Sequence, residues 1–107
     1  MFILTNSFSI NMLSGSMNVE FYKISLSMAV DLLKEYGFSS AVGHQDTANL
    51  FSNILDLDVP MNRSTVVLDQ NTALIVGQYS GPRLPEGCTT LPDGARIIWW
   101  KVQPTVD

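Results

Sequence analysis

The sequence predicts a single α/β domain, in which a mixed sheet of about five to six strands is flanked by two principal helices. Three observations support this class. Short apolar runs at 2–5 and 73–76 are typical of buried strands. Two segments, ending at Tyr36 and Leu55, repeat apolar residues at helical spacing. A chain of 107 residues is long enough for one modest core.

Three short strands are expected in the first half of the chain, each rich in apolar or aromatic residues. These strands cover residues 2–5, 19–26 and 38–42. The first helix begins after Ser25 or Ser27, either of which can cap it, and ends before Gly37. The second helix runs over about 46–55, because Asp46 and Thr47 are helix-capping residue types.

Three more strands are expected in the second half. These strands cover residues 64–68, 72–79 and 96–102. Alternation along the last strand places Trp99 and Trp100 on opposite faces of the sheet. A turn is predicted at 69–71, and residues 103–107 are predicted to form a loose tail of the domain 1–107.

Charge and composition exclude several classes of function. The net charge is −4 with six cationic residues, which argues against a protein that tracks along long DNA or RNA. A small nucleotide in a pocket remains compatible, because one or two arginines can supply the donors that it needs. One cysteine and one histidine exclude an internal disulfide and a Cys/His zinc cluster. Neither a metal nor a cofactor is expected. The cysteine count suits the cytoplasm, and no apolar run is long enough for a membrane span.

The junction at 41–50 combines a short apolar run, Gly43, the single histidine His44 and the start of a helical pattern. A helix N-terminus carries partial positive charge and unpaired N–H groups, which together can form a binding site for phosphate. Beside that phosphate, His44 can donate or accept a proton near neutral pH. The alternative is that His44 is an ordinary surface or half-buried polar residue.

Several further polar segments lie at expected strand ends or in loops. Taken with the junction they are Asn6-Ser7-Phe8-Ser9-Ile10-Asn11, Gly43-His44-Gln45-Asp46, Asn62-Arg63 and Arg83-Leu84-Pro85-Glu86-Gly87. Each alone can be explained by turn chemistry or by a solvated pair such as Arg83 and Glu86.

Together these motifs resemble those of the viral type III anti-CRISPR ring nucleases. The likeness rests on Asn6-x-Phe8-Ser9-x-Asn11-Met12-Leu13, Ser40-Ala41-Val42-Gly43-His44, Asn62-Arg63 and Arg83-Leu84-x-Glu86-Gly87, in this order along the chain. That family often has a helix after its Arg-Leu-x-Glu-Gly motif, for which Leu91-Pro92-Asp93-Gly94 leaves little room here.

The resemblance implies a homodimer that binds cyclic tetra-adenylate, a type III CRISPR messenger, across its two-fold axis. It implies metal-free cleavage to linear di-adenylate with a 2′,3′-cyclic phosphate, which switches off the signal in the host cytoplasm. The essential histidine corresponds to His44, and the late arginine and glutamate to Arg83 and Glu86. The residues expected to bind the ligand are Asn6, Ser9, Asn11, Gly43 and Arg63.

The chemistry of these residue types is compatible with that reaction. A ribose 2′-OH held in line with its phosphorus makes the cleavage intramolecular. His44 as imidazolium can protonate the leaving 5′-oxygen, while Arg83 and the helix end after Gly43 stabilise the phosphate oxygens. Glu86 can hold His44 or Arg83 in place.

Two alternatives remain open from the sequence. The first is a binding module for the same ligand or for a related ring such as hexa-adenylate, with little turnover. The second is a small structural or interaction dimer, for which Trp99 or Trp100 would suit a protein interface.

Overall fold

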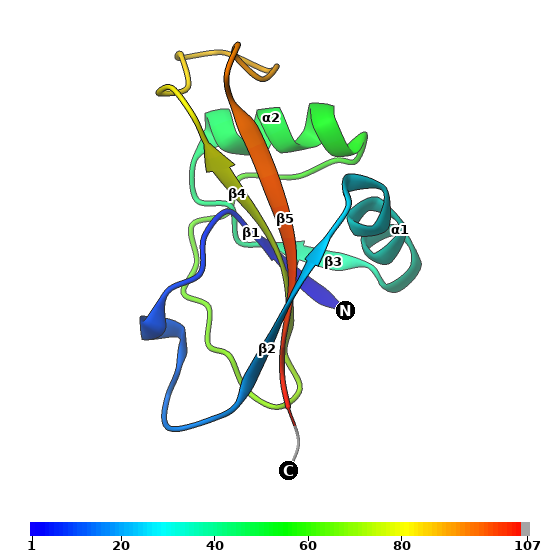
Figure 1. Ribbon diagram of the computed structural model, residues 1–107, viewed down its shortest axis with the longest axis vertical. Coiled ribbons are helices and arrows are strands. Elements are labelled where there is room, and N and C mark those ends of the chain that lie inside the picture. The colour runs from blue at the N-terminus through cyan, green and yellow to red at the C-terminus, as the bar shows by residue number, and fades with distance from the viewer. Residues whose placement is uncertain (106–107) are drawn as a thin grey trace.

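A five-stranded mixed sheet forms the centre of the computed structural model, which describes residues 1–105 (Figure 1). The elements follow in the order β1 (Phe2–Thr5), η1 (Ile10–Met12, a 3-10 turn), β2 (Val19–Ile24), α1 (Leu26–Tyr36), β3 (Phe38–Ser40), α2 (Gln45–Leu55), β4 (Ala73–Ser80) and β5 (Arg96–Pro104). The predicted α/β class with two principal helices is therefore confirmed. No helix of the described residues is long and apolar enough to cross a membrane.

The strand order in the sheet is β2-β5-β4-β1-β3. β1 pairs in parallel with both β3 and β4, and Leu4 lies opposite Ser40 on one side and Ile75 on the other. β5 is antiparallel to β4 and to β2. Because β1, β3 and β4 run the same way, the segments that follow them all begin at the same end of the sheet.

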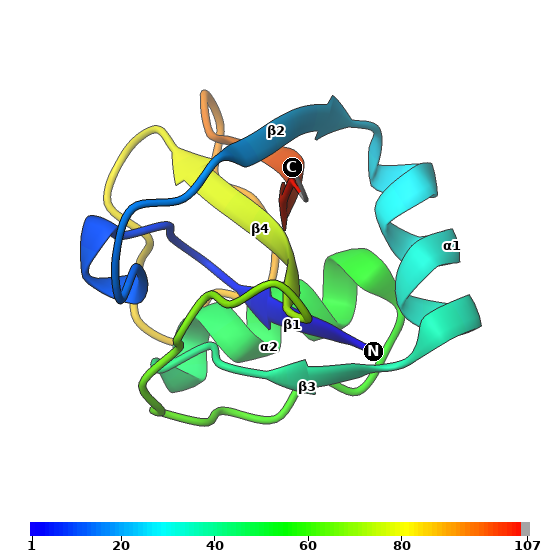
Figure 2. The same cartoon turned by 90° about the horizontal axis from the view of Figure 1, so that it is seen from below.

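The two faces of the sheet are covered differently. On one face, Leu4, Ile75 and Trp99 pack against buried residues of both helices. On the other face, Val76 and Trp100 pack against loop residues between β1 and β2 and before β4. Figures 1 and 2 show α1 and the loop with the short blue turn η1 on opposite sides of the molecule. Trp99 and Trp100 thus face opposite ways, as the alternation predicts.

Both helices have the caps that fix their ends. The Ser25 hydroxyl accepts a hydrogen bond from the Met28 N–H at 3.0 Å, which selects Ser25 over Ser27 as the cap of α1. Gly37 ends the helix with φ of 73°, a backbone conformation that glycine adopts without steric cost. Local signals therefore set both ends of α1.

α2 rests on the sheet through two aromatic rings. The ring centroids of Phe51 and Trp99 are 5.1 Å apart, and both side chains are buried. They lie over Gly77 of β4, where an added Cβ atom would come within 2.6 Å of the Trp99 ring and 2.8 Å of the Phe51 ring. The absence of a side chain at Gly77 lets the helix approach the strand this closely.

One predicted strand is wrong, and others end elsewhere. Residues 64–68 contain no strand, because their backbone meets a loop and not a sheet edge: the Leu68 N–H donates to the Met12 carbonyl. The strands predicted over 19–26 and 38–42 end at Ile24 and Ser40. The last strand continues to Pro104, into the segment 103–107 expected to be loose, and residues 106–107 lie outside the described residues.

The predicted turn at 69–71 is confirmed. The Asp69 carboxylate accepts hydrogen bonds from the Thr72 hydroxyl at 2.8 Å and from the Asn71 N–H at 2.9 Å. These bonds stabilise the charged carboxylate and lower the pKa of Asp69 below its usual value.

Replacing Gly77 by alanine is expected to destabilise the protein by about 1–3 kcal/mol, because the methyl group collides with two buried rings. The free energy of unfolding in urea measures this change. Gly15→Ala is the control, since nothing lies within 4 Å of an added Cβ atom there. Equal stability of the two variants would contradict the packing described for α2.

Candidate functional site

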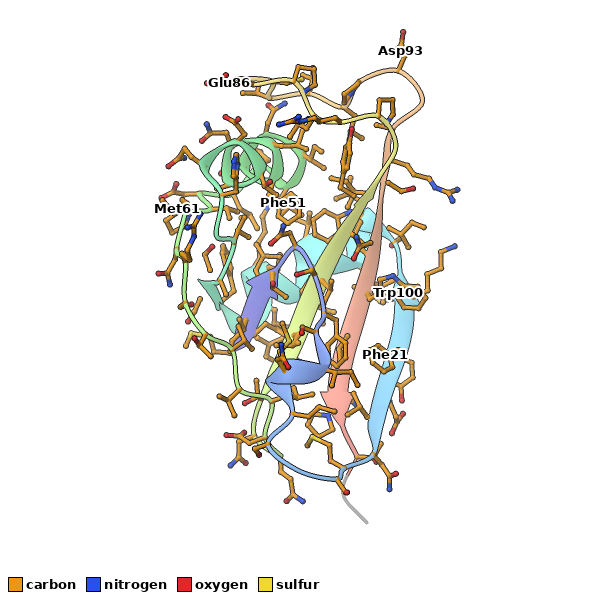
Figure 3. All side chains as sticks on the ribbon, turned by 90° about the vertical axis from the view of Figure 1, so that its left-hand side faces the viewer. Phe21, Phe51, Met61, Glu86, Asp93 and Trp100 are labelled. Atoms are coloured by element: carbon orange, nitrogen blue, oxygen red, sulfur yellow. The ribbon has the colours of Figure 1, made fainter. Side chains whose placement is uncertain are left out.

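An open hollow with a volume of about 700 Å³ lies where the segments after β3 and β4 meet. Its lining comes from the start of α2 and from the loop between β4 and β5: His44, Gln45, Asp46, Arg83, Leu84, Pro85 and Glu86. We call it the His44 hollow. Figure 3 shows Glu86 at the same end of the molecule as α2, with Phe51 between the helix and the strands. The three residues expected to be catalytic, His44, Arg83 and Glu86, therefore line one cavity.

His44 is the N-cap of α2. Its Nδ1 accepts a hydrogen bond from the Asp46 N–H at 3.3 Å, and its carbonyl accepts one from the Ala48 N–H. A ring nitrogen that accepts carries no proton, so the form of His44 that makes this contact has its hydrogen on Nε2. The helix thus begins one residue before the predicted start, with His44 in the capping position expected for Asp46 or Thr47.

The junction between β3 and α2 is held by the segment that follows Pro60. Asn62 donates twice, from its backbone N–H to the Val42 carbonyl and from its side-chain amide to the Ser40 carbonyl, both at 2.8 Å. Arg63 donates from Nε and Nη2 to the Gly43 carbonyl at 3.3 and 3.2 Å. Two motifs that are separate in the sequence therefore form one junction.

A second hollow, of about 390 Å³, adjoins the first and shares Arg83 and Leu84 with it. Its other lining residues are Asn6, Thr47, Leu50, Tyr79 and Gly81. We call it the Asn6 hollow. Asn6 directly follows β1, so the ends of all three parallel strands contribute to this region.

Ser9 and Asn11 lie apart from both hollows. Ser9 caps the η1 turn, where its hydroxyl accepts a hydrogen bond from the Asn11 N–H at 3.2 Å. In a single chain these two residues shape the loop between β1 and β2.

The charges around the His44 hollow nearly balance. Asp46 and Glu86 line it together with Arg83, and Arg63 stands at the adjoining junction. The α2 N-terminus adds partial positive charge. Within residues 1–105, no hydrogen bond or ion pair joins Glu86 to His44 or Arg83, and no group of three His, Cys, Asp or Glu residues is placed to hold a metal ion. Glu86 was expected to hold His44 or Arg83 in place. The described residues show it lining the same cavity as both, without a hydrogen bond or ion pair to either.

Comparison with known proteins places the chain in a family. The profile of the STIV B116-like family matches residues 2–93, which include every residue of both hollows. The chain belongs to the STIV B116-like family.

Two relatives of this STIV B116-like protein come from viruses of Sulfolobus. The solved structure of B116 of Sulfolobus turreted icosahedral virus is similar to this one, with a TM-score of 0.79 and a sequence identity of 26%. The match covers 95% of this chain and 97% of that one. "Uncharacterized protein 26" of a Sulfolobus islandicus filamentous virus is 40% identical over 53 residues, or 50% of this chain. The match spans 45% of that relative's length. The family is thus one of archaeal virus proteins.

Three residues at or beside the site of this STIV B116-like protein were not predicted from its sequence to have these roles: Thr47, Tyr79 and Asn62. Thr47 and Tyr79 line the Asn6 hollow, but nothing in their local sequence distinguishes them from ordinary helix and strand residues. The structural role of Asn62 was also missed, since its partners lie about twenty residues away in the chain. Both depend on which segments the sheet brings together.

Asn62→Ala is expected to lower the free energy of unfolding by about 1 kcal/mol, because the buried Ser40 loses the donor to its carbonyl. Urea denaturation measures this loss. In Asn71→Ala, the matched control, an exposed asparagine side chain is removed from a turn and stability is expected to change little. A loss in Asn62→Ala no greater than in this control would argue against the junction contact.

Proposed function

We propose that this chain is a metal-independent ring nuclease that binds cyclic tetra-adenylate as a homodimer. It cleaves the ring to linear di-adenylate with a 2′,3′-cyclic phosphate and so switches off type III CRISPR signalling in the host cytoplasm. The observation that carries this proposal is that His44, Arg83 and the N-terminus of α2 line one cavity.

The phosphate is proposed to sit in the His44 hollow, against the first turn of α2. The N–H groups of that turn and the Arg83 guanidinium offer hydrogen bonds and positive charge to its oxygens. Arg63 reinforces this indirectly, because its bonds to the Gly43 carbonyl hold the junction in place and its charge is close by.

An adenine base is proposed to sit in the Asn6 hollow. The Tyr79 ring together with Leu50 and Leu84 offers apolar surface, and Asn6 and Thr47 offer hydrogen-bonding groups for the edge of the base. Because Arg83 belongs to both hollows, a nucleotide can span them with its base in one and its phosphate in the other.

The proposed reaction requires the protein mainly to orient the reacting atoms and to donate one proton to the leaving oxygen. The 2′-OH attacks the adjacent phosphorus and gives up its proton to solvent water, the bond to the 5′-oxygen breaks, and a 2′,3′-cyclic phosphate forms. Holding these atoms in line supplies much of the acceleration. Arg83 and the α2 N–H groups stabilise the charge that develops on the phosphate oxygens.

His44 is proposed to give the leaving 5′-oxygen its proton from Nε2. To do so the imidazole must first be protonated at Nδ1, which ends its hydrogen bond with the Asp46 N–H. That N–H then becomes free to bind a phosphate oxygen. Ligand binding and formation of the imidazolium are therefore expected to favour each other.

A homodimer is proposed because the ring contains repeated nucleotides while each chain supplies one pair of hollows. Two chains related by a two-fold axis present two equivalent sites to a ring of matching symmetry. Ser9 and Asn11, which lie outside the hollows of their own chain, are proposed to reach the ring in the paired arrangement.

A second candidate is a binder of the same ligand without turnover. The observation that favours it is the use of His44 Nδ1 as a helix cap, which suits a neutral imidazole that only holds phosphate. Such a protein would sequester the messenger without destroying it.

Incubation with radiolabelled cyclic tetra-adenylate in EDTA tests the proposal. The wild type is expected to release di-adenylate with a 2′,3′-cyclic phosphate, and His44→Ala is expected to cut roughly 10²–10⁴ times more slowly. His44→Asn is the sharper variant, because asparagine caps helices well but cannot carry the proton. It should fold, bind the ring and fail to cut.

Binding without any cutting by the wild type would replace the nuclease with the binder. Absence of binding would overturn both. Wild-type rates in His44→Asn would show that the imidazole gives no proton.

Asp46→Asn is expected to tighten binding of cyclic tetra-adenylate by roughly fivefold at low salt, because it removes a negative charge from the phosphate side of the hollow. The gain should shrink as salt is added. Fluorescence titration measures it, with Asp31→Asn on α1 as a control of equal charge change. Weaker binding in Asp46→Asn than in the control would show that the carboxylate helps to hold the ligand.

A further inference from the structure

The loop between β4 and β5 (residues 81–95) carries Arg83 and Glu86 but has no helix or strand of its own. Its position decides where the Arg83 guanidinium stands relative to the His44 ring. The contacts that hold this β4–β5 loop are therefore as important for the site as the residues that line it.

The first part of the loop is fixed close to the sheet. The Tyr79 hydroxyl donates to the Pro82 carbonyl, so the end of β4 holds the residue before Arg83. Gly81 packs tightly on Ala95, since an added Cβ atom would stand 2.6 Å from the Ala95 Cα atom. These contacts close the base of the loop.

The far part of the loop is fixed to α2. The Asn53 side-chain amide donates to the Thr89 carbonyl at 2.7 Å, across 36 positions of the chain. Between the two attachments the backbone turns, with the Cys88 N–H donating to the Pro85 carbonyl at 3.1 Å. Arg83 and Glu86 lie in the span between Pro82 and Thr89.

We propose that Asn53 is a positioning residue that fastens the β4–β5 loop to α2 and thereby sets the placement of Arg83 relative to His44. The same helix begins with His44 and bears Asn53 in its last turn. One rigid element therefore holds both sides of the His44 hollow. This role in the reaction rests on the proposed function, whereas the fastening itself does not.

Cys88 makes the fastening measurable without any ligand. It is the chain's single cysteine, it is half-buried, and it adjoins Thr89. Its thiol donates to the Thr90 carbonyl at 2.8 Å, within the same turn of the loop. The rate at which a maleimide labels Cys88 therefore reports how often this part of the loop opens.

The test compares Asn53→Ala with Asn49→Ala. Both asparagines are exposed on α2, and each replacement removes one hydrogen bond, but Asn49 bonds to Gln45 of the same helix. Asn53→Ala is expected to label about fivefold faster than the wild type, as loss of a typical hydrogen bond predicts, and Asn49→Ala at the wild-type rate. In the unlabelled protein, kcat for cyclic tetra-adenylate should fall about tenfold in Asn53→Ala.

A double variant separates positioning from general weakening. Once Arg83→Ala has removed the guanidinium, adding Asn53→Ala should cause no further loss of kcat. Additive losses would overturn the positioning role, and so would faster labelling with unchanged kcat. Unchanged labelling would overturn the fastening. If the wild type does not cut the ring, the proposed function and the role in the reaction fail, while labelling still decides whether Asn53 holds the loop.

Discussion

The parallel pairing of β1 with β3 on one side and β4 on the other is the constraint on which the rest of the structure depends. Parallel strands place their carboxyl ends together, and open α/β sheets commonly bind ligands at that edge. Here Asn6 follows β1, His44 follows β3 and Arg83 follows β4. Residues from three distant parts of the chain therefore meet around two adjoining hollows.

The placement of α2 brings a helix N-terminus to the sheet edge where the three parallel strands end. Phe51 and Trp99, packed over Gly77, hold the helix on the sheet, while Asn62 and Arg63 hold the junction that leads into it. Its N-terminus, with the partial positive charge of the helix, consequently lines the His44 hollow through His44, Gln45 and Asp46. The element that packs on the core is thus the same one whose N-terminus is proposed to bind the phosphate.

The cap role of His44 and its proposed role as an acid would link the stability of α2 to the chemistry of the site. As a cap it needs an unprotonated Nδ1, and as an acid it needs a proton on both nitrogens. A phosphate that accepts the Asp46 N–H would compensate for the lost cap bond. A negatively charged ligand would therefore stabilise the charged imidazole directly and also through the helix.

Local patterns were sufficient to predict most elements from the sequence. The apolar run before Thr5 and the glycine after α1 act within a few residues, so propensity and capping chemistry determine them. The strand predicted over 64–68 failed because alternation cannot reveal whether a sheet edge is available. Candidate residues such as His44 and Arg83 were recognisable by type and by motif.

Their convergence was not predictable from local sequence, because it depends on strand order. The cap role of His44 was not predicted because Asp46 and Thr47 are stronger capping types, although its bond to the Asp46 N–H spans only two residues. The hold of Asn62 and Arg63 on the junction was not predictable, because their partners lie about twenty residues away in the chain. Long-range hydrogen bonds therefore fix the junction that leads into α2.

The central claim is that two chains together bind one cyclic tetra-adenylate ring. Calorimetric titration tests it most directly, with the His44→Asn variant as the protein so that the ring stays intact. We expect one ring bound per two chains, with binding strongly weakened when Arg83→Ala is added. One ring per chain, or binding indifferent to Arg83, would contradict a paired site built on the His44 hollow.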